Sequence, residues 1–136
     1  MAVERSCRGQ GVGSHLFRAT VDLAARIRPG SPLLLEVESD SGDGPKRREQ
    51  RKRQEFYRRL GCRRIPSLAY RLPPHVSEQQ PGMDLLVYAV APTPSIPRLR
   101  VGEWLSEIYG QVYDSSPVHP RIAQMLGALP DPVPIA

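Results

Sequence analysis

The spacing of apolar residues divides the chain into alternating helices and strands. Between residues 12 and 27 apolar positions recur three or four apart, which predicts a helix with one buried face at Val12, Leu16, Thr20, Leu23 and Ile27. Pro29 and Gly30 end this helix. The apolar run LLLEVES, Leu33 to Ser39, then predicts a buried strand of the kind found in sheets with parallel pairing.

The next helix and strands follow a polar loop at residues 39–45. A highly charged helix is predicted from Lys46 to Leu60, and Gly61 is expected to end it in a left-handed conformation. A weak strand is predicted from Ser67 to Leu72 and a stronger one from Met83 to Val90, with a mostly polar loop between them.

The C-terminal part is predicted to be helical after the Pro-rich connector APTPSIP. The periodicity gives a third helix from Leu99 to Tyr113 and a short fourth helix around residues 122–129. The tail PDPVPIA is expected to be irregular. With Met1 to Arg5 as the end of a strand, this order predicts an α/β fold with a mixed sheet, and its first strand–helix–strand segment is a crossover unit.

Length and composition place the chain among small globular domains. It has 136 residues, of which 40% are hydrophobic, and no run reaches the roughly 20 apolar residues of a membrane span. The N-terminus lacks the apolar stretch of a signal peptide, so a cytoplasmic location is expected. Cys7 and Cys62 form neither a disulfide framework nor a metal motif, and the three histidines are scattered, so no metal is expected.

The positive charge is concentrated in one element. Between Lys46 and Arg64 ten basic residues stand against Glu49 and Glu55, so this segment carries +8 and the rest of the chain −3. Such a helix can be a solvated face, can meet the outer phosphate of a cofactor, or can bind RNA. Aromatic residues for base stacking are nearly absent from it, so nucleic acid is not the expected partner.

The stretch CRGQGVGSHLF places Gly9, Gly11 and Gly13 directly before the first predicted helix. Glycine permits positive φ and close approach of a ligand, and the first amides of a helix favour an anion such as phosphate. The spacing is neither G-x-G-x-x-G nor a P-loop. A tight turn that only lets the helix pack remains an alternative to a phosphate-binding loop.

Residues Arg8 to Gly13, RGQGVG, fit the pattern R/Q-x-x-G-x-G/A, the pyrophosphate loop of the GNAT superfamily of N-acetyltransferases, and the chain resembles that family. EFYRRLGC, Glu55 to Cys62, is similar to the family's F-Y-x-x-x-G-F motif, with Cys62 in place of the final aromatic residue. The family has several strands and two helices before its loop, whereas seven residues precede Arg8 here. The chain therefore looks like the C-terminal half of the fold.

The resemblance implies a partial acyl-CoA N-acyltransferase domain over residues 1–91, followed by a helical extension over residues 92–136. Acetyl-CoA is then the acyl donor, with the pyrophosphate held by Arg8, Gly9, Gln10, Gly11, Val12, Gly13 and Ser14, and the pantetheine arm lying along Val3. The strand at Leu33 to Ser39 resembles the one that splays from its neighbour to admit this arm. The implied acceptor is a primary amine that attacks the thioester directly.

Tyr57 is the residue to which the resemblance assigns catalysis, as the acid that protonates the departing coenzyme A thiolate. Its alternative role is that of a core tyrosine. A base for the amine is sought among Glu4, Glu36 and Glu38, none of which matches a family position firmly. Two other functions remain open, namely a member that binds coenzyme A or a protein without catalysis, and a basic nucleic-acid-binding module. Self-association is expected if the early strands are missing.

Overall fold

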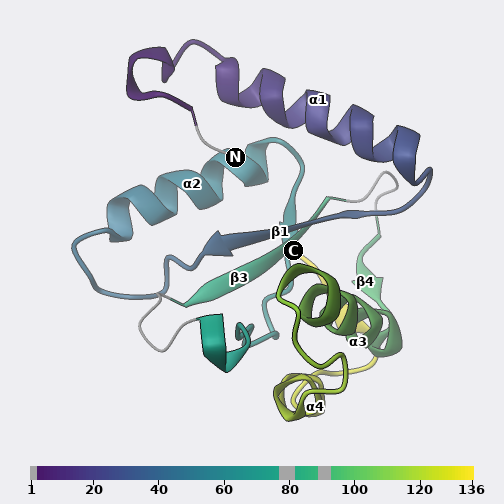
Figure 1. Cartoon of the computed structure of the whole chain (residues 1–136). Coiled ribbons are helices and arrows are strands. Elements are labelled where there is room, and N and C mark those ends of the chain that lie inside the picture. The colour runs from purple at the N-terminus through teal and green to yellow at the C-terminus, as the bar shows by residue number, and fades with distance from the viewer. Residues whose placement is uncertain (1–2, 77–81, 89–92) are drawn as a thin grey trace.

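The computed structural model describes residues 3–76, 82–88 and 93–136 and has a mixed α+β architecture (Figure 1). Within those ranges lie four α-helices, a three-stranded sheet and a two-stranded sheet. The helices are α1 (Val12–Ile27), α2 (Arg47–Arg59), α3 (Arg98–Glu107) and α4 (Pro120–Gly127), and the strands are β1 (Leu33–Glu38), β2 (Arg63–Arg64), β3 (Met83–Tyr88), β4 (Ser95–Ile96) and β5 (Val133–Pro134). None of the helices in the described ranges is long and apolar enough to cross a membrane.

The three-stranded sheet has the order β1-β3-β2, and β3 runs antiparallel to both neighbours. The register pairs Leu33 with Tyr88 and Glu38 with Met83. β1 and β2 are therefore parallel to each other but separated by β3, and α2 connects them in a split β-α-β arrangement. The expected parallel pairing of residues 33–39 is wrong, because an apolar run reports burial on both faces and not the direction of the neighbouring strand.

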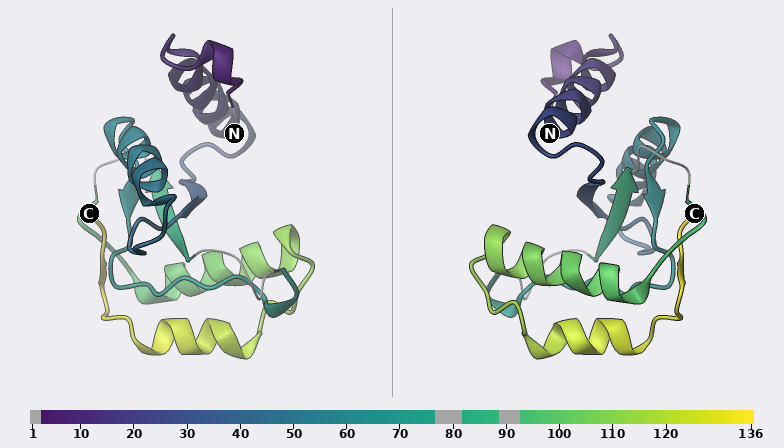
Figure 2. Two further views of the ribbon diagram at one scale, coloured as in Figure 1. Left: turned by 90° about the vertical axis from the view of Figure 1, so that its left-hand side faces the viewer. Right: turned by 90° about the vertical axis from the view of Figure 1, so that its right-hand side faces the viewer.

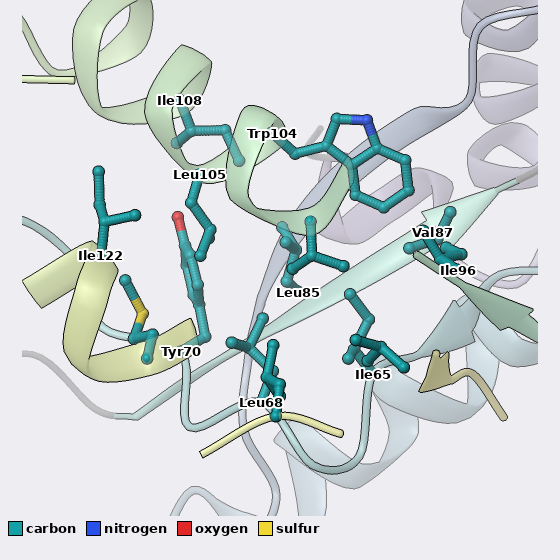
Figure 3. Packing of buried hydrophobic residues seen from close by; sticks show 14 of the residues in the cluster. Ile65, Leu68, Tyr70, Leu85, Val87, Ile96, Trp104, Leu105, Ile108 and Ile122 are labelled. Atoms are coloured by element: carbon teal, nitrogen blue, oxygen red, sulfur yellow. The ribbon is translucent and has the colours of Figure 1, made fainter. Parts of the chain in front are cut away.

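The two faces of the sheet bury two different hydrophobic clusters. Leu33, Leu35 and Val37 of β1 pack with Phe17 of α1 and Tyr57 of α2. On the opposite face, alternate residues of β3 pack under α3 and α4 in a larger cluster (Figure 3), which includes Leu85, Val87, Val101, Trp104, Leu105 and Ile122. Residues of the expected C-terminal extension thus belong to the same core as the sheet.

The predicted strand from Ser67 to Leu72 is wrong. The strand that pairs with β3 is β2, Arg63–Arg64, and residues 67–72 follow it without regular structure. Leu68, Tyr70 and Leu72 are nevertheless buried, which accounts for the alternating pattern. In this segment the Tyr70 amide donates to the carbonyl of Leu68. The carbonyls of Arg71 and Leu72 accept from the side chains of Tyr109 and Arg121, so side chains and not a neighbouring strand satisfy this part of the backbone.

The C-terminal tail is regular, contrary to expectation. β5 pairs antiparallel with β4, and the amide and carbonyl of Ala136 both hydrogen-bond to the backbone of Arg64. Before α4, α3 continues directly into a π-helical turn, η3 (Ile108–Val112). Together α3 and η3 span nearly the whole helix predicted from Leu99 to Tyr113. The tail therefore covers the outer edge of β2.

The N-terminal segment differs from the expected strand end. Val3 and Glu4 lie outside any strand and η1 (Arg5–Cys7) is a 3₁₀ turn, while Met1 and Ala2, like residues 89 and 90 of the later predicted strand, lie outside the described residues. A second short 3₁₀ turn, η2 (Pro74–Val76), lies within the predicted polar loop.

Helix α1 buries a different face from the one predicted. Phe17 is buried, with Val21 and Ala24 half-buried beside it. Four members of the predicted apolar face are exposed, with relative accessibilities of 41% for Val12, 41% for Leu16, 57% for Leu23 and 70% for Ile27. Figure 2 shows α1 at the end of the molecule opposite α3 and α4, so those helices do not cover that face.

Candidate functional site

The loop before α1 uses glycine at two positions where the backbone requires it. Gly9 and Gly11 have φ angles of +82° and +78°, in the left-handed region that residues with a Cβ rarely adopt. The 3₁₀ turn η1 brings the chain into this loop, and the amide of Cys7 donates to the carbonyl of Glu4 at 2.9 Å. Gly11 is the residue that caps α1.

Gly13 serves packing. A Cβ added there would lie 3.2 Å from Cζ of Phe56, so its absence lets the first turn of α1 approach α2 closely. Gly9 and Gly11 therefore shape the turn and Gly13 brings two helices together, as the packing interpretation requires, while phosphate binding by the loop stays a prediction.

The N-terminus of α1 is open to an anion. The first amides of an α-helix have no partner inside the helix and carry the positive end of its dipole. No described side chain caps this end, and its first turn contains no acidic residue. His15 lies in the same turn, and its Nδ1 is 2.8 Å from the carbonyl oxygen of Gly11. The amides of Val12, Gly13 and Ser14 thus remain available as hydrogen-bond donors.

A cavity of about 670 Å³ lies between this loop and α2, which we call the loop cavity. Seven of the predicted site residues line it: Val3, Arg8, Gly9, Gly11, Gly13, Ser14 and Tyr57. Gln10 and Val12 do not. The Nε2 atom of Gln10 lies 3.5 Å from the carbonyl of Ser6, to which it donates, and the side chain of Val12 is exposed.

Helix α2 contributes four residues that sequence reasoning did not assign to the site, Glu49, Lys52, Arg53 and Phe56. Their spacing of three and four places them on one helix face, a signal that was present in the sequence. With Arg8 they give the loop cavity three cations and one carboxylate. Arg53 also pairs with Glu38 at 3.5 Å, and Arg8 donates from Nε to the carbonyl of Val3 at 3.2 Å.

Tyr57 lies at the inner end of the loop cavity. Its ring packs edge-on against Phe17 and Phe56, with centroid separations of 5.9 and 5.2 Å. Burial raises the pKa of the Tyr57 phenol, although Arg53 acts in the opposite sense, so the hydroxyl is protonated at neutral pH and can donate. No residue in the described ranges accepts a hydrogen bond from it.

A second cavity of about 270 Å³ continues from Tyr57 along the outer edge of β1, and we call it the edge cavity. It is lined by Tyr57, by Phe17 and Thr20 of α1, and by the consecutive β1 residues 33–36. β1 is the outermost strand of the described sheet on this side, so its outward backbone groups face the cavity. Tyr57 lines both cavities and therefore lies between them.

The three candidate bases differ in their surroundings. Glu36 lines the edge cavity and accepts hydrogen bonds on both carboxylate oxygens, from the hydroxyls of Tyr70 and Tyr113. Burial and this carboxylate raise the pKa of both tyrosines, which therefore stay protonated as donors. Glu38 is paired with Arg53, and Glu4 is exposed. Glu36 is the carboxylate that lies near Tyr57.

No group of His, Cys, Asp and Glu residues in the described ranges could hold a metal ion. Comparison of the chain with protein-family models, with curated proteins and with solved structures gives no match.

Proposed function

We propose that the chain is an N-acetyltransferase-type protein that binds acetyl-CoA and transfers the acetyl group to a primary amine. The observation that carries this proposal is the loop cavity, in which the glycine loop, the open N-terminus of α1 and the Tyr57 hydroxyl line one space. These are the elements that the resemblance to the GNAT superfamily assigns to the pyrophosphate and to the departing thiolate. Lys52 and Arg53 of α2 line the same cavity and add positive charge for a pyrophosphate.

The outer part of the loop cavity suits a pyrophosphate. The amides of the α1 N-terminus supply hydrogen bonds and a positive dipole end, and each favourable charge near such an end is worth about 0.3–1 kcal/mol. Lys52 and Arg53 face the loop from α2, and Arg8 lies within it. A doubly charged diphosphate here meets a net positive charge, because Lys52 and Arg53 of α2 add to Arg8 of the loop and outnumber Glu49.

The edge cavity suits the pantetheine arm. Its amide groups require hydrogen-bond partners, and the unpaired backbone of an edge strand offers both donors and acceptors. β1 presents such an edge over residues 33–36, directly beyond Tyr57. The thioester then lies between the two cavities, within reach of the Tyr57 hydroxyl. Tyr57 donates its proton to the sulfur as the carbon–sulfur bond breaks.

The test is a thermal-shift titration with acetyl-CoA. Ligand at about 100 times its Kd is expected to stabilise the protein by about 2.7 kcal/mol. Gly11→Asp is expected to abolish the shift, because a carboxylate then occupies the position of the phosphate. Gly30→Asp is the matched control, since Gly30 has the same φ of +78° but lies outside the loop.

No shift of the wild-type chain at millimolar acetyl-CoA would overturn the proposal. An equal loss of the shift in Gly11→Asp and Gly30→Asp would remove the loop from it. A shift without release of coenzyme A in the presence of amines would favour the alternative of a protein that binds coenzyme A without catalysis.

A further inference from the structure

A third cavity of about 580 Å³ shares the lining residue Leu34 with the edge cavity, and we call it the α3 cavity. It lies between the turn that joins α1 to β1 and the outer face of α3. Five of its lining residues carry its chemistry: Arg28, Leu34, Arg100, Trp104 and Glu107. No predicted site residue lines it.

The three cavities share lining residues in one order. Tyr57 lines both the loop cavity and the edge cavity, and Leu34 lines both the edge cavity and the α3 cavity. The α3 cavity therefore lies at the end of β1 that follows the α1–β1 turn, beside Leu34. A second substrate needs such a position if the acyl donor occupies the first two cavities.

Tyr57, the proposed proton donor, and Glu36, the proposed base, lie on different faces of β1. Leu33 and Leu35 pack with Tyr57 in the smaller cluster, whereas Leu34 packs with the α3 cluster. Glu36 has the parity of Leu34, and its partners Tyr70 and Tyr113 are also on the α3 side. The proton donor and the carboxylate thus lie on opposite sides of the edge at which the thioester is placed.

Among the described residues, one cation and one anion that line the α3 cavity form no ion pair. Arg100 pairs with Glu103 at 2.8 Å. Arg28 and Glu107 form no ion pair with any other residue in the described ranges. Trp104 supplies an apolar wall between them and the core. A zwitterionic group fits such a set, since a carboxylate can meet Arg28 and an ammonium can meet Glu107.

We propose that the α3 cavity is the acceptor subsite and that the acceptor is a small amino acid with a side-chain amine, of which L-lysine is the simplest. This inference rests on the proposed function. Its α-carboxylate binds Arg28, its α-ammonium binds Glu107, and its side-chain amine extends along β1 to Glu36. Leu34 and Glu36 are two residues apart, about 7 Å along a strand, which a four-carbon side chain covers.

The reaction balances with the groups present. Each oxygen of Glu36 retains a lone pair beside the one that accepts from a tyrosine, so the carboxylate can take a proton from the side-chain ammonium. The amine nitrogen then bonds to the thioester carbonyl carbon, and Tyr57 protonates the thiolate as the carbon–sulfur bond breaks. The nitrogen loses its second proton, which returns to the Tyr57 phenolate through water, and Glu36 releases the first proton to solvent. The amide, free coenzyme A and one proton are the products.

The experiment compares three amines by release of coenzyme A: L-lysine, 1,5-diaminopentane, which lacks the carboxylate, and 6-aminohexanoate, which lacks the α-ammonium. Wild-type kcat/KM is expected to be highest for lysine. Arg28→Gln is expected to lower it about tenfold for lysine and 6-aminohexanoate, with diaminopentane unchanged. Glu107→Gln is expected to lower it about tenfold for lysine and diaminopentane, with 6-aminohexanoate unchanged.

Arg26→Gln and Asp22→Asn are the matched controls, because they make the same charge changes on exposed residues of α1 that line none of the three cavities. Equal kcat/KM for the three amines, or equal effects of the cavity and control variants, would overturn the acceptor inference while leaving acetyl-CoA binding intact. If acetyl-CoA binds but no amine turns over, binding of L-lysine is measured directly by saturation-transfer NMR. Binding that Arg28→Gln weakens supports the subsite, and no lysine binding refutes it.

Discussion

The two edges of the three-stranded sheet are finished in opposite ways. At β2 the backbone of Arg64 is paired with Ala136, so the C-terminal tail covers that edge. At β1 no other strand of the described chain pairs with the outer side, and the edge cavity lies there instead. We call these the closed edge and the open edge. Open edges accept a further strand or a ligand with amide groups, so the open edge is where the chain can bind.

The helices on the two faces of the sheet also differ in how far they are covered. α3 buries Val101, Trp104 and Leu105 against the sheet, whereas α1 buries Phe17 and exposes Leu23 and Ile27. Both helices have apolar residues at helical spacing. The comparison teaches that such spacing predicts the helix, while burial depends on whether another element is present to cover the face.

The largest expected effect is at the open edge. Tyr57→Phe is expected to lower kcat by about 10²–10⁴-fold, because the thiolate then leaves without its proton donor. Binding of acetyl-CoA, measured by thermal shift, should be nearly unchanged. Tyr88→Phe is the matched control, since Tyr88 packs against the same Phe17 ring but lines neither the loop cavity nor the edge cavity. Equal turnover by wild type and Tyr57→Phe would remove Tyr57 from the mechanism.

The next effect is on stability and compares the two helices directly. Leu105→Ala is expected to cost about 2–5 kcal/mol of unfolding free energy, because the Leu105 side chain of α3 is fully buried in the core. Leu23→Ala on α1 is expected to change it by less than about 0.5 kcal/mol, because that side chain is exposed. Urea denaturation of both variants measures the difference. Similar costs would mean that α1 is covered in solution.

A pH titration probes water access to the smaller cluster at Cys62, the residue that precedes β2 and the closed edge. Burial raises the pKa of the Cys62 thiol to about 11 from an ordinary value of 9.0. The folded state therefore holds the proton above pH 9 while the unfolded state loses it, so stability present below pH 9 is lost as pH rises toward 11. The expected loss is about 2 kcal/mol. Comparing urea unfolding of wild type and Cys62→Ala at pH 8 and pH 10.5 isolates this contribution, and parallel profiles would contradict it.

The smallest effect concerns self-association through α1. The exposed apolar face at Leu16, Leu23 and Ile27 is expected to make the chain associate as its concentration rises. The double variant Leu23→Ser and Ile27→Ser should shift light-scattering masses toward the monomer. Leu99→Ser is the control, because Leu99 is 76% exposed but lies on α3, outside the apolar face of α1. A wild-type chain that stays monomeric throughout the series would contradict the expectation.

Periodicity predicted the helices well because each is specified by residues close in sequence. The spacing from Val12 to Ile27 gave the bounds of α1, and the charged run with Gly61 gave α2, whose stop has the expected left-handed φ of +95°. What failed depended on distant residues. The partner of β1 is β3, some fifty residues later, and the tail becomes a strand only because β4 lies beside it.

Prediction of the candidate site was limited for the same reason, since part of it depends on residues distant in sequence. The glycine loop and Tyr57 could be assigned from local motifs, and they line one cavity. Lys52 and Arg53 could not be told apart from the other basic residues of α2, because the sequence does not reveal which face of α2 is turned toward α1. Glu36 could not be separated from Glu4 and Glu38, because the tyrosines that hold it come from residues 70 and 113.

The position of β3 in the centre of the sheet has a consequence for how the chain folds. β1 and β2 are both made before β3, yet each depends on it for its ladder of hydrogen bonds. The paired residues of β1 and β3 are 45 to 55 positions apart, so the sheet forms only after a long loop has closed. Helices α1 and α2 can form locally much earlier, within about a microsecond. Arrival of residues 83–88 is therefore the step that should set the refolding rate, and a substitution such as Leu85→Ala should slow refolding in proportion to how far β3 has docked in the transition state.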